Sequence, residues 1–177
     1  SGLTNLVHLA LENNVITDLS PLANHPKLSE LVVIGNQITD IAPLGAMDSL
    51  TRLAVDQNGL TTIDSISNHP NPDEFSAWAN DIITLPHFGA NATLMKLGLG
   101  TNSLSDLSPL AGMLALKELS LDDNLIVDVG PLEPVTTLET LTLTHNQITD
   151  ISPLATLTAL EQLALEVNNI SDCSALA

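Results

Sequence analysis

Apolar residues recur along this chain with a period of 22 residues, and an asparagine is the fixed point of each repeat. The asparagines are Asn14, Asn36, Asn58, Asn80, Asn102, Asn124, Asn146 and Asn168. An apolar residue stands five positions before each of them and another stands three positions before. Because side chains alternate between the two faces of a strand, this spacing predicts a short strand with one buried face in every repeat.

The residues after each asparagine predict how the chain returns to the next strand. A second apolar pair follows at two and five positions beyond the asparagine, as at Ile16 and Leu19. Five repeats then carry a proline before a leucine, at Pro21, Pro43, Pro109, Pro131 and Pro153. Proline has a fixed φ and no N–H donor, so we expect 3₁₀ or irregular structure on the return path and no long α-helix.

Stacking of the repeats is the physical reason for the pattern. One coil of 22 residues cannot bury its own leucines, whereas coils stacked about 4.8 Å apart bury them in a continuous column. Each asparagine stands where the chain leaves the sheet, so its amide can satisfy unpaired backbone groups of adjacent coils. We therefore predict a structural ladder of all eight asparagines. The aspartates four residues beyond the asparagine are predicted to cap the turn that follows; they are Asp18, Asp40, Asp106, Asp128, Asp150 and Asp172.

The spacing Leu-x-x-Leu-x-Leu-x-x-Asn-x-Ile, followed by Asp-Ile-Ser-Pro-Leu, resembles the 22-residue leucine-rich repeat of bacterial internalins. It is clearest from Leu28 to Leu44 and from Leu138 to Leu154, and it extends over the whole chain. The resemblance implies an α/β-type leucine-rich-repeat solenoid: right-handed, with eight coils, a parallel β-sheet on the concave face and a 3₁₀ or irregular convex face. It also implies a bacterial surface or secreted protein that binds a protein ligand.

The fourth repeat, residues 71–92, departs most from the pattern. It has Pro72 in place of a leucine, and Phe75 and Ala77 as its strand pair. Because it keeps the length of 22 residues, we interpret it as a degenerate coil within a single domain spanning residues 1–177. Solenoids need polar caps, and neither end of this chain resembles one. We expect the chain to be a fragment of a longer protein, whose uncapped end coils allow end-to-end self-association.

Residues six, four and two positions before each asparagine alternate with the buried pair, so they are expected on the concave side of the sheet, called the sheet face below. The candidate partner-binding residues on it are Ile34, Arg52, Asp56, Trp78, Lys96, Glu118, Asp122 and Glu166. A tryptophan rimmed by carboxylates is typical of an interface anchor. The alternative is a one-residue slip of the degenerate coil, which would turn Trp78 inward. Charges alternate in sign from Glu30 to Glu118, which favours cross-strand ion pairs or partner recognition.

Charge and composition limit the classes of partner that this chain can bind. The net charge of −17 makes nucleic acid and anionic membrane surfaces poor partners. The apolar runs are far shorter than the roughly 20 residues of a membrane helix, so no membrane insertion is expected. Cys173 is the single cysteine, which excludes an internal disulfide, and its place in the repeat predicts a buried thiol.

The sequence offers little chemistry. Ser120, Asp122 and His145 can be drawn as a triad on adjacent strands, yet an open sheet lacks an oxyanion hole. His25 and His69, both in Asn-His-Pro, are expected to be packing or turn residues. We therefore expect no catalytic residue, cofactor or metal, and a non-enzymatic protein-binding module. The alternatives are a structural spacer that displays other domains, and an intracellular regulatory or scaffold subunit of the related repeat type.

Overall fold

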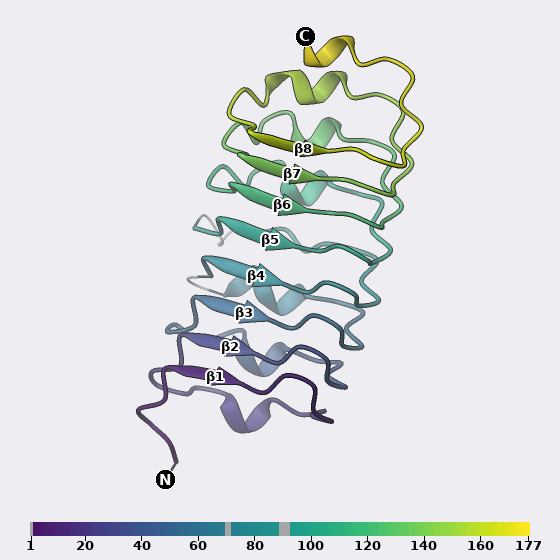
Figure 1. Cartoon of the computed structure of the whole chain (residues 1–177). Coiled ribbons are helices and arrows are strands. Elements are labelled where there is room, and N and C mark those ends of the chain that lie inside the picture. The colour runs from purple at the N-terminus through teal and green to yellow at the C-terminus, as the bar shows by residue number, and fades with distance from the viewer. Residues whose placement is uncertain (1, 70–71, 89–92) are drawn as a thin grey trace.

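The computed structural model describes residues 2–69, 72–88 and 93–177, and its strands form one sheet of eight parallel strands in sequence order (Figure 1). The strands are β1 (His8–Ala10), β2 (Glu30–Val32), β3 (Arg52–Ala54), β4 (Glu74–Ser76), β5 (Lys96–Gly98), β6 (Glu118–Ser120), β7 (Thr140–Thr142) and β8 (Gln162–Ala164). Each strand is followed by a return path behind the sheet. The predicted solenoid of eight coils is therefore confirmed.

The return paths contain short 3₁₀ helices, as the prolines predict. They are η1 (Ser20–Leu22), η2 (Ala42–Leu44), η3 (Asp64–Asn68), η4 (Ser108–Leu110), η5 (Gly130–Leu132), η6 (Ser152–Thr156) and η7 (Ser174–Leu176). Five of these helices have proline in their first turn, where its missing N–H is not needed. No α-helix occurs in the described ranges.

The strands pair in a register of one repeat, which fixes the faces of all eight coils. Leu9 lies opposite Leu31, Leu31 opposite Leu53, and the pattern continues to Leu163. The degenerate fourth coil keeps this register: β4 pairs with both β3 and β5, and Phe75 is fully buried. Its residues 70–71 and 89–92 lie outside the described part of the chain.

The core is a continuous column of leucine, isoleucine and valine between the sheet and the return path. Leucines of the inner coils, such as Leu31 and Leu119, are buried, whereas Leu9 and Leu163 in the end coils are only partly buried. The expectation of a buried thiol is wrong: Cys173, in the last coil of this sequence, is exposed.

The asparagines link each coil to the preceding one. Asn36 Nδ2 donates to the Val33 carbonyl of its own coil at 2.9 Å and to the Leu11 carbonyl of the preceding coil at 3.0 Å. Asn36 Oδ1 accepts a hydrogen bond from the Ile16 N–H at 3.0 Å. The same bonds to the preceding coil recur at Asn58, Asn80, Asn102, Asn124, Asn146 and Asn168. Asn14 belongs to the first coil, and its amide donates only to carbonyls of that coil.

The turn that holds each asparagine has a fixed backbone conformation. The residue before every asparagine has a positive φ, between 52° and 67°. Only Gly35 is a glycine; the others include Thr101 and Val167, which are β-branched and disfavour this conformation. The bonds of the neighbouring asparagine therefore hold the turn against an unfavourable local preference.

The six repeated aspartates bond to the start of the return path. The side chain of Asp18 accepts the N–H of Ser20 at 2.7 Å, and Asp150 accepts that of Ser152 at 2.8 Å. The remaining four make the same bond two residues ahead, at Asp40, Asp106, Asp128 and Asp172. These hydrogen bonds, from the Ser20 backbone first and then from its hydroxyl, lower the pKa of Asp18 below 3.8. Each carboxylate satisfies an amide that opens a 3₁₀ turn.

The two Asn-His-Pro histidines have different environments. His25 Nδ1 accepts the Leu28 N–H at 3.2 Å, so this ring stabilises a turn. His69 is 1% exposed, and neither ring nitrogen has a hydrogen-bond partner within the described ranges. Burial lowers the pKa of His69 below 6.5, and the negative charge of Asp48 opposes this shift. Burial therefore favours the neutral form of the His69 imidazole.

The asparagine ladder predicts that removing an inner asparagine costs more stability than removing the asparagine of the first coil. Asn124→Ala should lower the free energy of unfolding by about 1–3 kcal/mol, because the Leu104 N–H loses its partner and the Leu99 carbonyl loses one of its two donors. Asn14→Ala is the matched control and should cost less, because Asn14 bonds only within its own coil. Urea unfolding followed by circular dichroism measures both. Equal losses would show that the bonds between coils add nothing.

Burial of His69 predicts a pH dependence of stability. As the pH falls below about 6.5, the unfolded chain binds a proton that the folded chain does not, so stability should decrease until the pH reaches the lowered pKa. His69→Leu should remove this decrease, and His145→Gln, at an exposed site, is the matched control. Unfolding midpoints measured between neutral and mildly acidic pH test this. A parent and a His69→Leu variant with the same decrease would contradict it.

Candidate binding face

The sheet face consists of three rows of outward-pointing residues. Because the strands pair one repeat apart, side chains 22 residues apart are neighbours on this face. The first row begins at His8 and the second at Ala10, at the two ends of β1. The third row begins at Glu12, two residues after the end of β1. The candidate residues lie in the first and third rows, across the whole sheet.

The first row is a chain of ion pairs. His8 Nδ1 lies 2.6 Å from Glu30 Oε2, and Arg52 contacts both Glu30 and Glu74, the latter at 3.3 Å. Hydrogen bonds from His8 and then Arg52 lower the pKa of Glu30, and the Glu30 bond raises that of Arg52. Since these side chains are partly exposed, solvent screens the pairs and each adds little to stability.

Lys96 continues this row. Its ammonium lies 2.7 Å from Glu118 Oε1, and this hydrogen bond raises the pKa of Lys96. Beside the sheet, Lys117 pairs with Glu139 in the same way. Lys27, the remaining basic residue, donates to Asn5 Oδ1 at 2.8 Å. All four lysine and arginine side chains of the chain are thus engaged with acceptors, and the excess charge of the molecule is negative.

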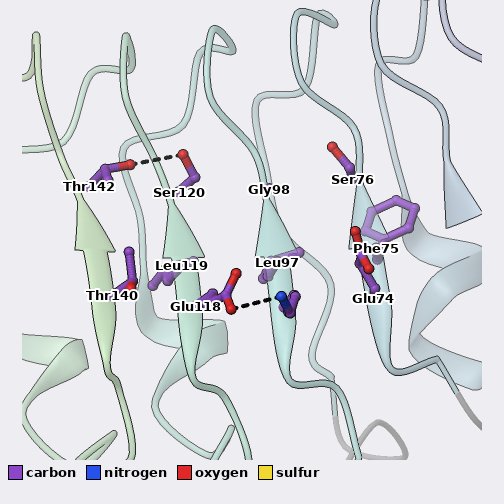
Figure 2. Close-up of a pocket in the computed structure, with 11 residues that line it drawn as sticks. Glu74, Phe75, Ser76, Leu97, Gly98, Glu118, Leu119, Ser120, Thr140 and Thr142 are labelled. Carbon is purple, nitrogen blue, oxygen red and sulfur yellow. Dashed lines mark hydrogen bonds and ion pairs between the residues drawn. The ribbon is translucent and has the colours of Figure 1, made fainter. Parts of the chain in front are cut away.

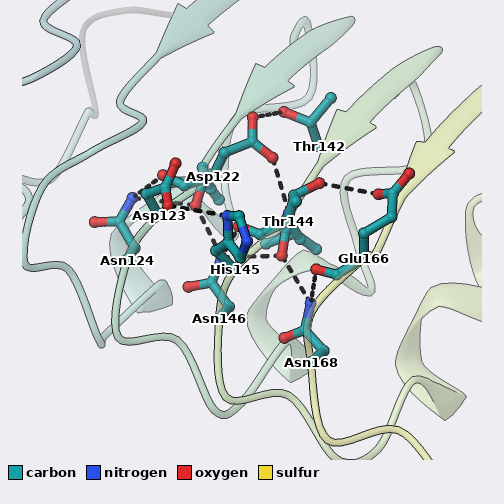
Figure 3. Close-up of polar contacts among 11 residues, drawn as sticks. Asp122, Asp123, Asn124, Thr142, Thr144, His145, Asn146, Glu166 and Asn168 are labelled. Atoms are coloured by element: carbon teal, nitrogen blue, oxygen red, sulfur yellow. Dashed lines mark hydrogen bonds and ion pairs between the residues drawn. The ribbon is translucent and has the colours of Figure 1, made fainter.

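Asp122 is tied into the sheet by its neighbours (Figure 3). Its Oδ1 accepts the Thr144 N–H at 2.8 Å, and its Oδ2 accepts the Ser120 hydroxyl at 3.0 Å and the Thr142 hydroxyl. The Thr144 hydroxyl in turn donates to Glu166 at 3.0 Å. Hydrogen bonds lower the pKa of Glu166, first the bond from its own backbone N–H and then the bond from the Thr144 hydroxyl.

Asp56 makes the equivalent contacts three coils earlier. It is 9% exposed, and its Oδ1 accepts the Ser76 hydroxyl and, at 2.5 Å, the Trp78 N–H. The sequence places Asp56 and Asp122 on the sheet face as candidate partner contacts. In the structure the carboxylates of both residues accept hydrogen bonds from the outward hydroxyl and the backbone N–H of the following coil.

Trp78 is the prominent apolar side chain of the sheet face. It is 41% exposed, so the degenerate coil has not slipped and the indole does not turn into the core. The indole lies over Gly100 of the next coil: a Cβ built on Gly100 would come within 1.6 Å of Trp78 Nε1. The absence of a side chain at this position leaves the room that the ring occupies. Ile34, in the same row, is partly buried.

A cavity of about 280 Å³ opens on the sheet face across β4 to β7 (Figure 2). Gly98 lies at its centre, between Ser76 and Ser120 on the adjacent strands. Three charged residues of the first row line one side of the cavity: Glu74, Lys96 and Glu118. Gly98 in β5 and Gly100 just beyond it are not among the sequence-predicted site residues. The missing side chain at Gly98 leaves the cavity open, and the missing side chain at Gly100 leaves room for the Trp78 indole.

The residues that could form a catalytic triad are not assembled. His145 Nδ1 lies 3.1 Å from Asp123, whereas Asp122 bonds to Ser120 and the threonines (Figure 3). No cluster of three or more histidine, cysteine or acidic side chains suited to a metal ion occurs in residues 2–69, 72–88 and 93–177. Over the same ranges, no helix has the length and hydropathy needed to span a membrane.

These features define a leucine-rich-repeat protein, and the comparisons agree. The family of leucine-rich repeats in two copies matches residues 4–46 and 136–177. A comparison with curated proteins gives no match. Among solved structures, an internalin, InlF, of Listeria monocytogenes is 31% identical over 99% of this chain and 52% of its own, with a TM-score of 0.93. Internalin C2 of the same bacterium is 32% identical over 97% of this chain and 76% of its own, with a TM-score of 0.91.

The chain belongs to the internalin-like family of leucine-rich repeat proteins. It spans about half the length of the first of these two internalins. InlJ of Listeria monocytogenes, 27% identical over 97% of this chain and 37% of its own with a TM-score of 0.79, has a functional domain that includes a cysteine ladder. The present chain has a single cysteine. Its repeated turn residue is asparagine instead.

The seat of Trp78 can be tested through fluorescence, because Trp78 is the only tryptophan and the chain has no tyrosine. Gly100→Ala should displace the indole into water and shift its emission to longer wavelength, since the added methyl would overlap the ring. Gly112→Ala is the matched control, because no atom lies within 4 Å of its added Cβ. Emission spectra of the folded variants decide the matter. An unchanged spectrum in Gly100→Ala would contradict the placement of the ring.

Proposed function

We propose that this chain is a non-enzymatic protein-binding module that binds its ligand on the sheet face, and that it belongs to a bacterial surface or secreted protein. Membership of the internalin-like family supports a module of this class. The observation that carries the proposal is Trp78, an exposed indole on the sheet face that lies against Gly100 of the next coil. A preorganised aromatic side chain loses little entropy on binding, which is what an interface anchor requires.

The ion-pair row supports the same face. Arg52 and Lys96 lie on either side of Glu74, and their charges are partly exposed, so they can orient a partner without being buried unpaired. We assign Ile34, Glu118 and Glu166 to the rim of the interface. End-to-end self-association through the end coils stays a separate prediction.

A capture experiment tests the proposal. The parent chain is cross-linked to proteins of extracellular and cytosolic extracts and compared with the double variant Trp78→Ala, Arg52→Glu at low and moderate salt. A matched variant, Leu114→Ala, removes an exposed apolar side chain from the return path, where it is 61% exposed. A protein captured by the parent and by Leu114→Ala, but not by the double variant, supports binding on the sheet face and identifies the compartment. Loss in Leu114→Ala alone contradicts this face, and no specific capture favours a structural spacer.

Binding and stability should separate at Trp78. Trp78→Ala should change the free energy of unfolding by less than about 1 kcal/mol, because the ring lies outside the core. It should raise the Kd for a captured ligand by roughly thirtyfold, as loss of an anchor worth about 2 kcal/mol does. Urea unfolding and a binding isotherm measure the two effects. A large stability loss with unchanged affinity would remove Trp78 as the anchor.

A further inference from the structure

Asn58 differs from every other asparagine of the chain because a glycine follows it. The backbone nitrogen of the next residue can attack an asparagine side chain, and a side chain on that next residue obstructs the attack. Glycine has no side chain and reaches the required backbone conformations most readily. Other asparagines of the ladder precede larger residues, such as Gln37, Ser103 and Gln147. Asn58, before Gly59, is therefore the chemically most reactive member of the ladder.

In the folded chain, Ile38 of the preceding coil holds both reacting groups. The Ile38 N–H donates to Asn58 Oδ1 at 2.9 Å, and the Ile38 carbonyl accepts the Gly59 N–H at 3.0 Å. Asn58 Nδ2, the nitrogen that leaves in such a reaction, donates to three backbone carbonyls at 3.0–3.1 Å. Ile38 itself is fully buried. The reaction is therefore blocked while the coils of β2 and β3 stay in contact.

Separation of these two coils releases the groups that react. The Gly59 nitrogen, after it loses its proton to hydroxide, forms a bond to Asn58 Cγ. The Cγ–Nδ2 bond breaks, and the side-chain nitrogen takes a proton from water and leaves as ammonia, which regenerates the hydroxide. Water then opens the resulting cyclic imide at one of its two carbonyl carbons. The product at position 58 is an aspartate or an isoaspartate.

Neither product can restore the ladder at this coil. A carboxylate has no N–H, so it would place an oxygen where Asn58 Nδ2 donates to the carbonyls of Val33, Val55 and Asp56. An isoaspartate also directs the main chain through the former side chain and lengthens it by one carbon. The turn that follows would then leave the register on which stacking of the coils depends.

We infer that Asn58 is a site of spontaneous covalent modification, which occurs when the coils of β2 and β3 separate and which prevents them from joining again. The folded ladder protects the site, and each opening exposes it. Unfolding of this solenoid therefore becomes irreversible with time through a single residue, whether or not the sheet face binds a protein.

Peptide mapping by mass spectrometry tests the site and its protection. The whole chain is held at mildly alkaline pH, either folded in buffer or unfolded in guanidinium chloride, and conversion of each asparagine to aspartate or isoaspartate is followed. In the unfolded chain, Asn58 should convert at least about tenfold faster than Asn102, which precedes Ser103. Folding should slow the conversion of Asn58 by at least about tenfold.

A refolding series tests the consequence. Samples of the unfolded chain are diluted into buffer after increasing times, and circular dichroism and Trp78 emission measure the native fraction that is recovered. Recovery should decrease with the same time course as the conversion of Asn58.

Gly59→Gln is the matched control. Glutamine occupies this position in two other coils, and a Cβ on Gly59 would lie 3.4 Å from its nearest neighbour, Thr39 Cγ2, which is ordinary contact. This variant should fold, should convert at Asn58 at least about tenfold more slowly when unfolded, and should keep its ability to refold.

Four results would overturn the inference. They are conversion of Asn58 as fast in the folded as in the unfolded chain, conversion as fast in Gly59→Gln as in the parent, full refolding of the converted chain, and loss of refolding in Gly59→Gln at the rate of the parent. The last of these would place the irreversible step at another residue.

Discussion

The structure depends on the backbone amide that each coil leaves unpaired where its chain turns away from the sheet. No group within the coil satisfies it, and the side-chain oxygen of the next asparagine does, for example between the Ile38 N–H and Asn58 at 2.9 Å. Because this bond crosses between coils, a coil is complete only when its neighbour is in place. The interval of 22 residues follows, since an insertion would move the asparagine away from the amide it must reach.

The same constraint explains why the sheet face is free to vary. The leucine column and the asparagine ladder lie inside the solenoid or at the end of its strands. The outward rows contribute only backbone carbonyls to the ladder, as at Trp78, and their side chains take no part in it. Chemically different side chains can therefore occupy equivalent outward positions. Trp78 and Thr144 are such a pair, and an aspartate of the preceding coil accepts the backbone N–H of each.

The fold could be predicted from the sequence because each feature of the pattern recurs in most of the repeats. Period-2 alternation, the prolines and the asparagines lead to strands, 3₁₀ turns and stacking without further information. The same repetition misleads at Cys173, which occupies a core position of the repeat and is nevertheless exposed. It also gives no sign that Thr101 and Val167 adopt a positive φ, because the bonds of adjacent coils impose that conformation.

The candidate site was only partly predictable, since its shape comes from residues without side-chain chemistry. Alternation places Trp78 outward, and it is exposed there. The roles of Asp56 and Asp122 depend on hydroxyls one coil away, which the position of a single residue does not reveal. Gly98 and Gly100 have no charged or aromatic group that would mark them as site residues in the sequence. In the structure they decide where the cavity opens and where the indole lies.

A partner that binds over Trp78 leaves the return path exposed to solvent. Hydroxyl-radical footprinting of the free chain and of its complex with a captured protein, read by mass spectrometry, tests this most directly. Trp78 on the sheet face and Leu114 on the return path are both exposed in the free chain. Oxidation of Trp78 should decrease in the complex, and oxidation of Leu114 should not. Protection of Leu114 with unchanged oxidation of Trp78 would contradict it.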